Sequence, residues 1–220
     1  MRTGAMTLRT KLVPAELVRG LRLDQRGLAF VEFAVTLPIL LVLMSSGLEL
    51  ANYVIATKRI GEIAALVADN ASRIGTQSIL SNRPISEAEI NDVFIGADLE
   101  AGQLDLEGNG RIILSSLQRN EDDQQMISWQ RCFGSLAHPS SYGDEGNVGI
   151  SGMGPAGDQV TAAPGTAVMV VEIAYEYEPL VPFIGLPLGK ITDYAAFNIR
   201  DSRDLSRVDN SGKNEVSNCS

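Results

Sequence analysis

The stretch that decides the fold reads RGLAFVEFAVTLPILLVLMSSGLE and covers residues 26–49. From Leu28 to Leu48 it holds 21 residues with one charged side chain, Glu32. At about 1.5 Å per residue, a helix of this length is roughly 30 Å long, the thickness of a bilayer's hydrocarbon core. The sequence therefore predicts a transmembrane helix over residues 28–48 that carries a carboxylate near its start.

Charge is distributed unevenly on the two sides of this stretch. The chain has 220 residues and a net charge of −9, yet residues 1–27 form a basic leader of net charge +4 and the remainder has −13. Basic residues on a short flank keep that end of a membrane protein in the cytoplasm. We therefore expect a single-pass membrane protein with a cytoplasmic N-terminus and an exported C-terminal domain. The acidic balance argues against nucleic acid as a partner.

The helical pattern continues after the apolar run. Apolar residues recur at steps of three and four from Ile60 to Ile74, and charged side chains fall mostly on the other face. Gly75 is a candidate C-cap. We expect the helix to continue over residues 49–75 and to cover one side of a soluble domain.

Residues 76–220 carry the signals of that domain. Ser86 and Glu89 form a capping box that opens a short helix, which Gly96 is expected to end. Four strands follow, joined by turns and loops: Arg111–Gln118, Gln125–Phe133, Thr166–Tyr177 and Ile191–Arg200. This order favours an α+β fold, in which the long N-terminal helix packs on a small antiparallel β-sheet domain.

Two segments of the domain lack periodic patterns. Residues 134–166 are rich in glycine and proline, which predicts a long surface loop. The tail from about Asp201 is polar, which predicts a flexible segment.

The two cysteines, Cys132 and Cys219, are separated by 87 positions. In an exported, oxidising compartment they can form an intrachain disulfide, which would close a large loop and add ~4 kcal/mol of stability. Because Cys219 lies in the polar tail, a bond to another chain is the alternative.

The sequence offers no recognisable catalytic chemistry. His138 is the one histidine, and it lies in the glycine-rich loop six residues after Cys132, where a solvated histidine is the expected role. Structural zinc sites need about four ligands at regular spacing, which this sequence does not offer. The stretch Asp105-Leu-Glu-Gly-Asn-Gly lacks the glutamate that closes a calcium loop, so it is interpreted as a turn. We expect a protein that is not an enzyme and that has no cofactor or metal.

The residues around the start of the apolar run carry a resemblance. Gly27, followed by four apolar residues and then Glu32-Phe33, resembles a type IV prepilin signal, and VEFAVTLPILL at residues 31–41 resembles the TadE/TadG-like proteins of tight-adherence (Tad) pilus systems. Later pieces agree, namely NGRIILSS at 109–116, WQRCFG at 129–134, the strand at 170–177 and PLVP at 179–182.

The resemblance implies a minor pilin or pseudopilin that takes part in assembling an adhesion pilus. Its partners would be membrane lipid, other pilin or pseudopilin subunits, a prepilin peptidase and the Tad assembly machinery. In pilins of this kind the peptidase cuts after the glycine, here between Gly27 and Leu28. The new α-amino group, with an ordinary pKa near ~8, could then offset the assembly carboxylate Glu32 of a neighbouring subunit, or of its own helix.

Plainer interpretations remain for each of these features. Glu32 can be a snorkelling carboxylate at the membrane interface, and Gly27 can be an uncleaved junction. The whole protein can also be a membrane-anchored periplasmic binding module that has no filament role and uses the loop 134–166 for recognition. An exported hydrolase ranks last because the residues for it are missing.

Overall fold

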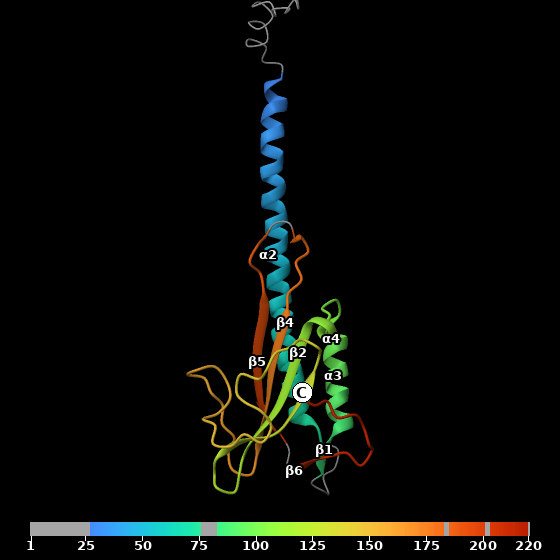
Figure 1. Cartoon of the computed structure of the whole chain (residues 1–220), viewed down its shortest axis with the longest axis vertical. Helices are drawn as coiled ribbons and strands as arrows, with labels where there is room; N and C mark the ends of the chain where they lie inside the picture. The colour runs from blue at the N-terminus through green and yellow to red at the C-terminus, as the bar shows by residue number, and fades with distance from the viewer. Residues whose placement is uncertain (1–26, 76–82, 183–184, 201–202, 220) are drawn as a thin grey trace, which may run out of the picture. The chain divides into compact units, whose positions relative to one another are not determined.

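The computed structural model describes residues 27–75, 83–182, 185–200 and 203–219. The chain divides into two compact units, residues 1–47 and 48–220. Apart from Gly27, the basic leader lies outside the described residues. Helix α2 (Leu28–Arg73) is one helix of 46 residues that begins in the first unit and ends in the second (Figure 1). The helical pattern after the apolar run is thus confirmed as far as Arg73.

The described part of the first unit is the apolar stretch of α2. Most of its large apolar side chains, among them Phe30, Ile39 and Leu43, are more than half exposed. The helix is long and apolar enough to cross a membrane, and the apolar part of it is not buried by the rest of the protein.

The second unit is built on a four-stranded antiparallel sheet. Its strands are β2 (Gly110–Arg119), β3 (Gln125–Phe133), β4 (Ala167–Glu176) and β5 (Lys190–Asn198), in the order β3-β2-β4-β5. The predicted strands and the hairpin between the first two are confirmed. Both β2 and β4 are buried along nearly their whole length, so this sheet must be covered on two faces.

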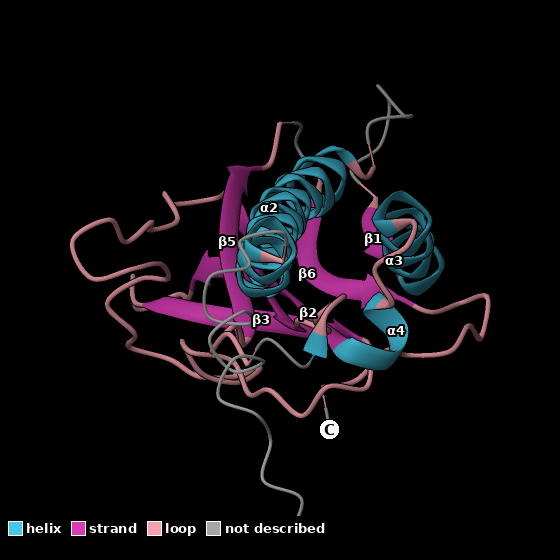
Figure 2. Cartoon of the chain, turned by 90° about the horizontal axis from the view of Figure 1, so that it is seen from above, coloured by secondary structure: helices cyan, strands magenta, loops and turns pink. Residues whose placement is uncertain are grey.

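Two helices cover the inner face of the sheet (Figure 2). Helix α2 contributes a stripe of small and β-branched residues at helical spacing: Ala56, Ile60, Ile63, Ala64, Val67, Ala68 and Ala71. A Cβ atom added at Gly61 would lie 2.5 Å from an Asp193 carboxylate oxygen, so this glycine permits the close approach of α2 and β5. The fold is α+β, with the helix packed on the sheet as the sequence predicts.

Helix α3 (Glu87–Ala101) is the second helix of this face, and it is longer than predicted. The capping box of Ser86 and Glu89 is confirmed. Gly96 does not end the helix, because Ala97 and Ala101 continue its buried face into the core. Their packing offsets the cost of a helical glycine, which is about 1 kcal/mol relative to alanine. A single turn, α4 (Leu106–Asn109), then leads into β2.

The outer face of the sheet is covered by the loop of residues 134–166. Met153 and Ala162 are buried there against Leu117, Ile127 and Val168. The loop lies at the surface for most of its length, as predicted, but the short stretch 152–154 and Ala162 are buried. A sheet with two apolar faces needs a second layer, and here irregular backbone supplies it.

The C-terminal tail contains structure that its composition did not predict. Strand β6 (Asp204–Asp209) pairs in parallel with β1 (Pro84–Ser86), which precedes α3. Residues about 120 positions apart thus meet in a second, two-stranded sheet.

Candidate functional site

The first unit presents one carboxylate on an otherwise apolar helix surface. Gly27 directly precedes α2, and its carbonyl accepts a hydrogen bond from the Val31 N–H at 3.1 Å. Glu32 lies one turn after Leu28, and both side chains are exposed. Within the described part of the chain, no group forms a hydrogen bond or an ion pair with the Glu32 carboxylate. Any partner for this charge in lipid must therefore come from elsewhere.

A second carboxylate of the same helix is buried. Glu49 belongs to the second unit and is 1% exposed. Its two oxygens accept hydrogen bonds from the Tyr177 hydroxyl at 2.7 Å and from the Val181 N–H at 2.8 Å. Asn52 Nδ2 donates to the same hydroxyl at 2.7 Å. Burial and the hydrogen bond to Glu49 raise the pKa of Tyr177, so its hydroxyl remains protonated and can donate.

The sequence did not predict this buried site, because its pattern marks Glu49 only as the end of the apolar run. Two signals could have found it. A carboxylate follows the apolar run directly, and the strongest predicted strand ends on Tyr177, a residue that can donate a hydrogen bond from a buried position. The contact between Glu49 and Tyr177 depends on the path of the connection between β4 and β5, and residue periodicity does not predict that path.

The two cysteines are joined within the chain. Cys132 and Cys219 form a disulfide, with their Cα atoms 4.9 Å apart. The Cys132 N–H donates to the Ser217 carbonyl at 2.7 Å, and the Ser217 hydroxyl donates to the Asn91 side chain at 2.8 Å. Asn91 in turn donates to the Glu215 carbonyl. The tail is therefore fastened to β3 and to α3.

A buried ion-pair group lies beside the disulfide and links α3 to β3. Arg131 contacts Glu87 at 2.6 Å and Glu145 at 2.9 Å, and the Arg131 and Glu87 side chains are 10% and 3% exposed. Burial lowers the pKa of Arg131, but the hydrogen bonds and charges of the two carboxylates outweigh it and raise the pKa overall. Removing Arg131 would leave the buried Glu87 without a charge partner, so this group serves the architecture.

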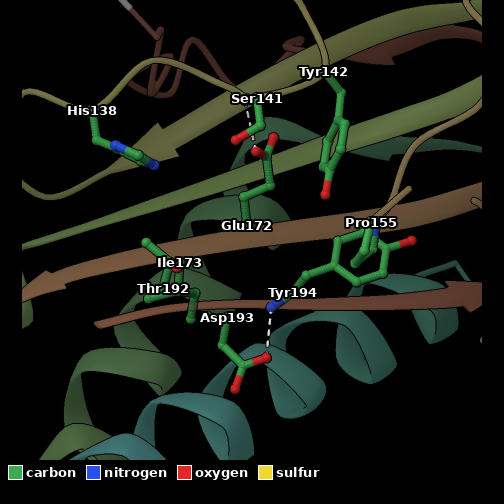
Figure 3. A pocket seen from close by; sticks show the side chains of 9 residues that line it. All are labelled: His138, Ser141, Tyr142, Pro155, Glu172, Ile173, Thr192, Asp193 and Tyr194. Atoms are coloured by element: carbon green, nitrogen blue, oxygen red, sulfur yellow. Dashed lines mark hydrogen bonds between the residues drawn. The ribbon is translucent and has the colours of Figure 1, made fainter. Parts of the chain in front are cut away.

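A hollow of about 290 Å³ opens on the outer face of β4 and β5 (Figure 3). It is lined by His138, Ser141, Tyr142, Pro155, Glu172, Ile173, Thr192, Asp193 and Tyr194. Glu172 accepts hydrogen bonds from the Ser140 hydroxyl at 2.5 Å and the Ser141 N–H at 2.8 Å. The rings of Tyr142 and Tyr194 meet edge to face, with centroids 5.9 Å apart.

The hollow holds groups of both charge signs. Burial, followed by the Tyr142 and Glu172 groups, raises the pKa of Tyr194 to about 12. Burial, followed by the positive charge of Lys190, lowers the pKa of His138, and the positive charge of Arg111 acts in the same direction. The hollow therefore combines the hydrogen-bonded Glu172 with two tyrosine rings and nearby cationic side chains.

The residues weighed for catalysis and metal binding do not come together. Cys132 is held in the disulfide, so it cannot act as a thiolate with His138. Asp105 caps α4 by accepting the Gly108 N–H at 2.8 Å, which agrees with its interpretation as a turn residue. In the ranges that the structure describes, no group of three His, Cys, Asp or Glu side chains could hold a metal ion.

Comparison of the chain with protein-family models, with curated proteins and with solved structures finds no match in any of the three. A function therefore has to be inferred from the residues and contacts of this chain itself.

Proposed function

We propose that this protein is a TadE/TadG-like minor pilin or pseudopilin, a structural component that helps to assemble a Tad (Flp-type) adhesion pilus. The observation that carries the proposal is a glycine before a long apolar helix, followed five residues later by Glu32, whose carboxylate has no partner in the described part of the chain. An isolated carboxylate in lipid costs on the order of a few kcal/mol. A plain anchor has no use for such a charge.

Cleavage and assembly together would satisfy Glu32. A peptidase that cuts after Gly27 creates an amine on Leu28, the first residue of α2. Assembly brings this amine of one subunit to Glu32 of the next, where opposite charges stabilise each other in a low dielectric. The junction suits a narrow protease site, because glycine has no side chain to obstruct it.

The proposed location is the inner membrane, with residues from about 50 onward in the periplasm. The basic leader and the acidic remainder support this orientation. The intrachain disulfide supports an oxidising compartment for the domain, because such bonds are rare in the cytosol. The role is non-enzymatic, and the expected partners are lipid, other pilin-like subunits, the peptidase and the assembly machinery.

Two substitutions test the proposal against a matched control. Glu32→Ala should keep the protein in the membrane and abolish piliation and adhesion, whereas Thr36→Ala, an exposed polar position one turn along the helix, should leave both intact. Gly27→Arg should block processing and leave a band heavier by the 27-residue leader. Normal adhesion with Glu32→Ala would remove the assembly role. A wild-type protein that keeps Met1 in membranes would remove the peptidase step.

Orientation is tested separately. A protease added to spheroplasts should digest the domain and spare the leader. A protected domain with a cut leader would reverse the proposed topology.

The hollow beside Glu172 favours a second candidate, a membrane-anchored periplasmic binding module. The loop 134–166 supplies Tyr142 and β5 supplies Tyr194, so this loop would form the recognition surface. Glu172→Gln distinguishes the two functions. Adhesion lost with normal filaments would favour the binding module, and unchanged adhesion would favour the assembly role.

A further inference from the structure

The connection between β4 and β5 is unusually apolar for a loop. Residues 179–189 read PLVPFIGLPLG, with six large apolar side chains, three prolines, two glycines and no charge. Of its described residues, Leu180 is 60% exposed and Leu186 is 36% exposed. Two exposed leucines in one uncharged stretch favour an interaction site, because a loop that faces only water gains nothing from them.

This connection is fastened at the end of the apolar run of α2. The Val181 N–H donates to Glu49, which directly follows Leu48, the last residue of that run. Tyr177, where the connection begins, donates to the same carboxylate, and its ring meets Tyr53 edge to face with centroids 5.1 Å apart. These contacts hold Leu180 beside the first turns of the helix in the second unit.

The helix exposes apolar side chains at the same level. Leu48, Leu50, Val54 and Ile55 are each at least half exposed. They extend about 10 Å along the helix axis, compared with about 5–8 Å for the interfacial layer on each side of a bilayer. Lys58, the first basic residue after the apolar run, lies three positions after Ile55.

We propose that the β4–β5 connection inserts Leu180 and Leu186 into the interfacial layer of the bilayer, as a second membrane contact of the domain beside its helix. The inference rests on the proposed anchoring of residues 28–48. Lipid is the occupant because the exposed apolar residues of α2 near this loop begin at Leu48, the last residue of the segment that is proposed to enter the membrane. Irregular backbone is tolerated at this depth because water is present there, unlike in the hydrocarbon core.

The buried Glu49 acts as a clamp in this arrangement. Its two hydrogen bonds tie the loop to the helix, so the two apolar surfaces enter the interface together. A domain held at two points cannot rotate freely about its helix, and the direction in which it faces along the membrane is therefore fixed.

Tryptophan fluorescence in lipid vesicles tests the insertion with the full chain. Leu180→Trp, Leu99→Trp and Leu40→Trp are compared in phosphatidylcholine vesicles with and without bromine on the upper acyl chain, after subtraction of the signal of the native Trp129. Leu99 is the matched control because it is an exposed leucine (76%) on α3. It lies beside Glu100, whose carbonyl accepts hydrogen bonds from Arg59, and Arg59 follows Glu49 on α2 by two to three turns. Leu40 reports whether the helix itself lies in the bilayer.

The expected result is blue-shifted, strongly quenched emission from Leu180→Trp and unquenched emission from Leu99→Trp. Quenching of Leu40→Trp without quenching of Leu180→Trp overturns this inference and leaves the anchoring intact. If Leu40→Trp is not quenched either, the anchoring fails and the inference fails with it. Equal quenching of Leu180→Trp and Leu99→Trp would also overturn it, because it would indicate non-specific adsorption of the domain.

Discussion

Glu32 and Glu49 lie 17 residues apart in one helix, and their surroundings are opposite. Glu49 is buried and accepts two hydrogen bonds, whereas Glu32 is exposed and has no partner within the described residues. The same contrast runs through the apolar residues, because Ile63 is fully buried and Ile39 is 58% exposed. The two regions of α2 therefore differ in their surroundings: from Ala56 onward a buried stripe completes the core of the second unit, whereas the apolar side chains before Leu48 are mostly exposed.

Removing the disulfide should give the largest effect, and this effect should be confined to the stability of the second unit. A Cys132→Ser/Cys219→Ser variant should lose about 4–5 kcal/mol of unfolding free energy, the chain-entropy value for a closure of 87 residues. Urea unfolding in detergent, followed by the buried Trp129, measures the loss. Membrane association should not change. An unaltered unfolding midpoint, or a disulfide-linked dimer of the wild type on non-reducing gels, would contradict the intrachain role.

Truncating one isoleucine in each region should separate core from lipid-facing surface. Ile63→Ala should destabilise the domain by about 2–5 kcal/mol, because it removes buried methyl groups and leaves a cavity. Ile39→Ala is the matched control and should leave the urea midpoint of the Trp129 signal in place. Equal shifts in the two variants would mean that the exposed half of the helix also supports the core.

The two carboxylates give the sharpest paired test. Glu49→Gln replaces one acceptor oxygen by an amide NH₂ that faces a donor, which should cost about 1–3 kcal/mol of domain stability. Glu32→Gln should leave the unfolding free energy unchanged and act only on assembly. Chemical denaturation of both variants in the same detergent provides the measurement. Loss of stability with Glu32→Gln would show that this carboxylate has a partner within the chain.

The smallest expected effect is a pH dependence that belongs to the domain alone. The pKa of Tyr194 is raised to about 12 in the folded protein, compared with about 10 for an unperturbed tyrosine, so the folded state holds the proton more tightly. Stability should therefore be fully present below pH 10 and decline as the pH rises towards 12. Tyr194→Phe should reduce this decline. Residues 28–47 contain no tyrosine, so membrane association should not follow it.

Local patterns predicted the elements that depend on nearby residues. The helical spacing from Ile60 onward, the capping box at Ser86 and the run of β-branched residues in β4 all specify structure through local preferences. The end of α3 could not be found in this way. Gly96 is a local signal for a helix end, but the helix continues through it because Ala97 and Ala101 are buried against the core.

The two candidate sites differ in the same way, because one follows from neighbouring residues and the other depends on distant segments. Gly27, Leu28 and Glu32 are adjacent in sequence, so their arrangement at one helix end follows from helix formation alone. The hollow of Glu172 and Tyr194 needs the loop 134–166 to fold over the outer face of the sheet, and composition gave no sign that Met153 and Ala162 of this loop would be buried.

The sequence by itself determined that this protein has one long apolar helix, a charge asymmetry around it, and an α+β domain after it, because these properties reside in composition and short-range spacing. Tertiary structure decided the pairing of β1 with β6, the closure of Cys132 on Cys219 and the burial of Glu49. Each of these joins segments about 90 to 130 residues apart. Closing such long loops costs chain entropy, so these contacts depend on the packing of the intervening chain and leave no signal in short-range spacing.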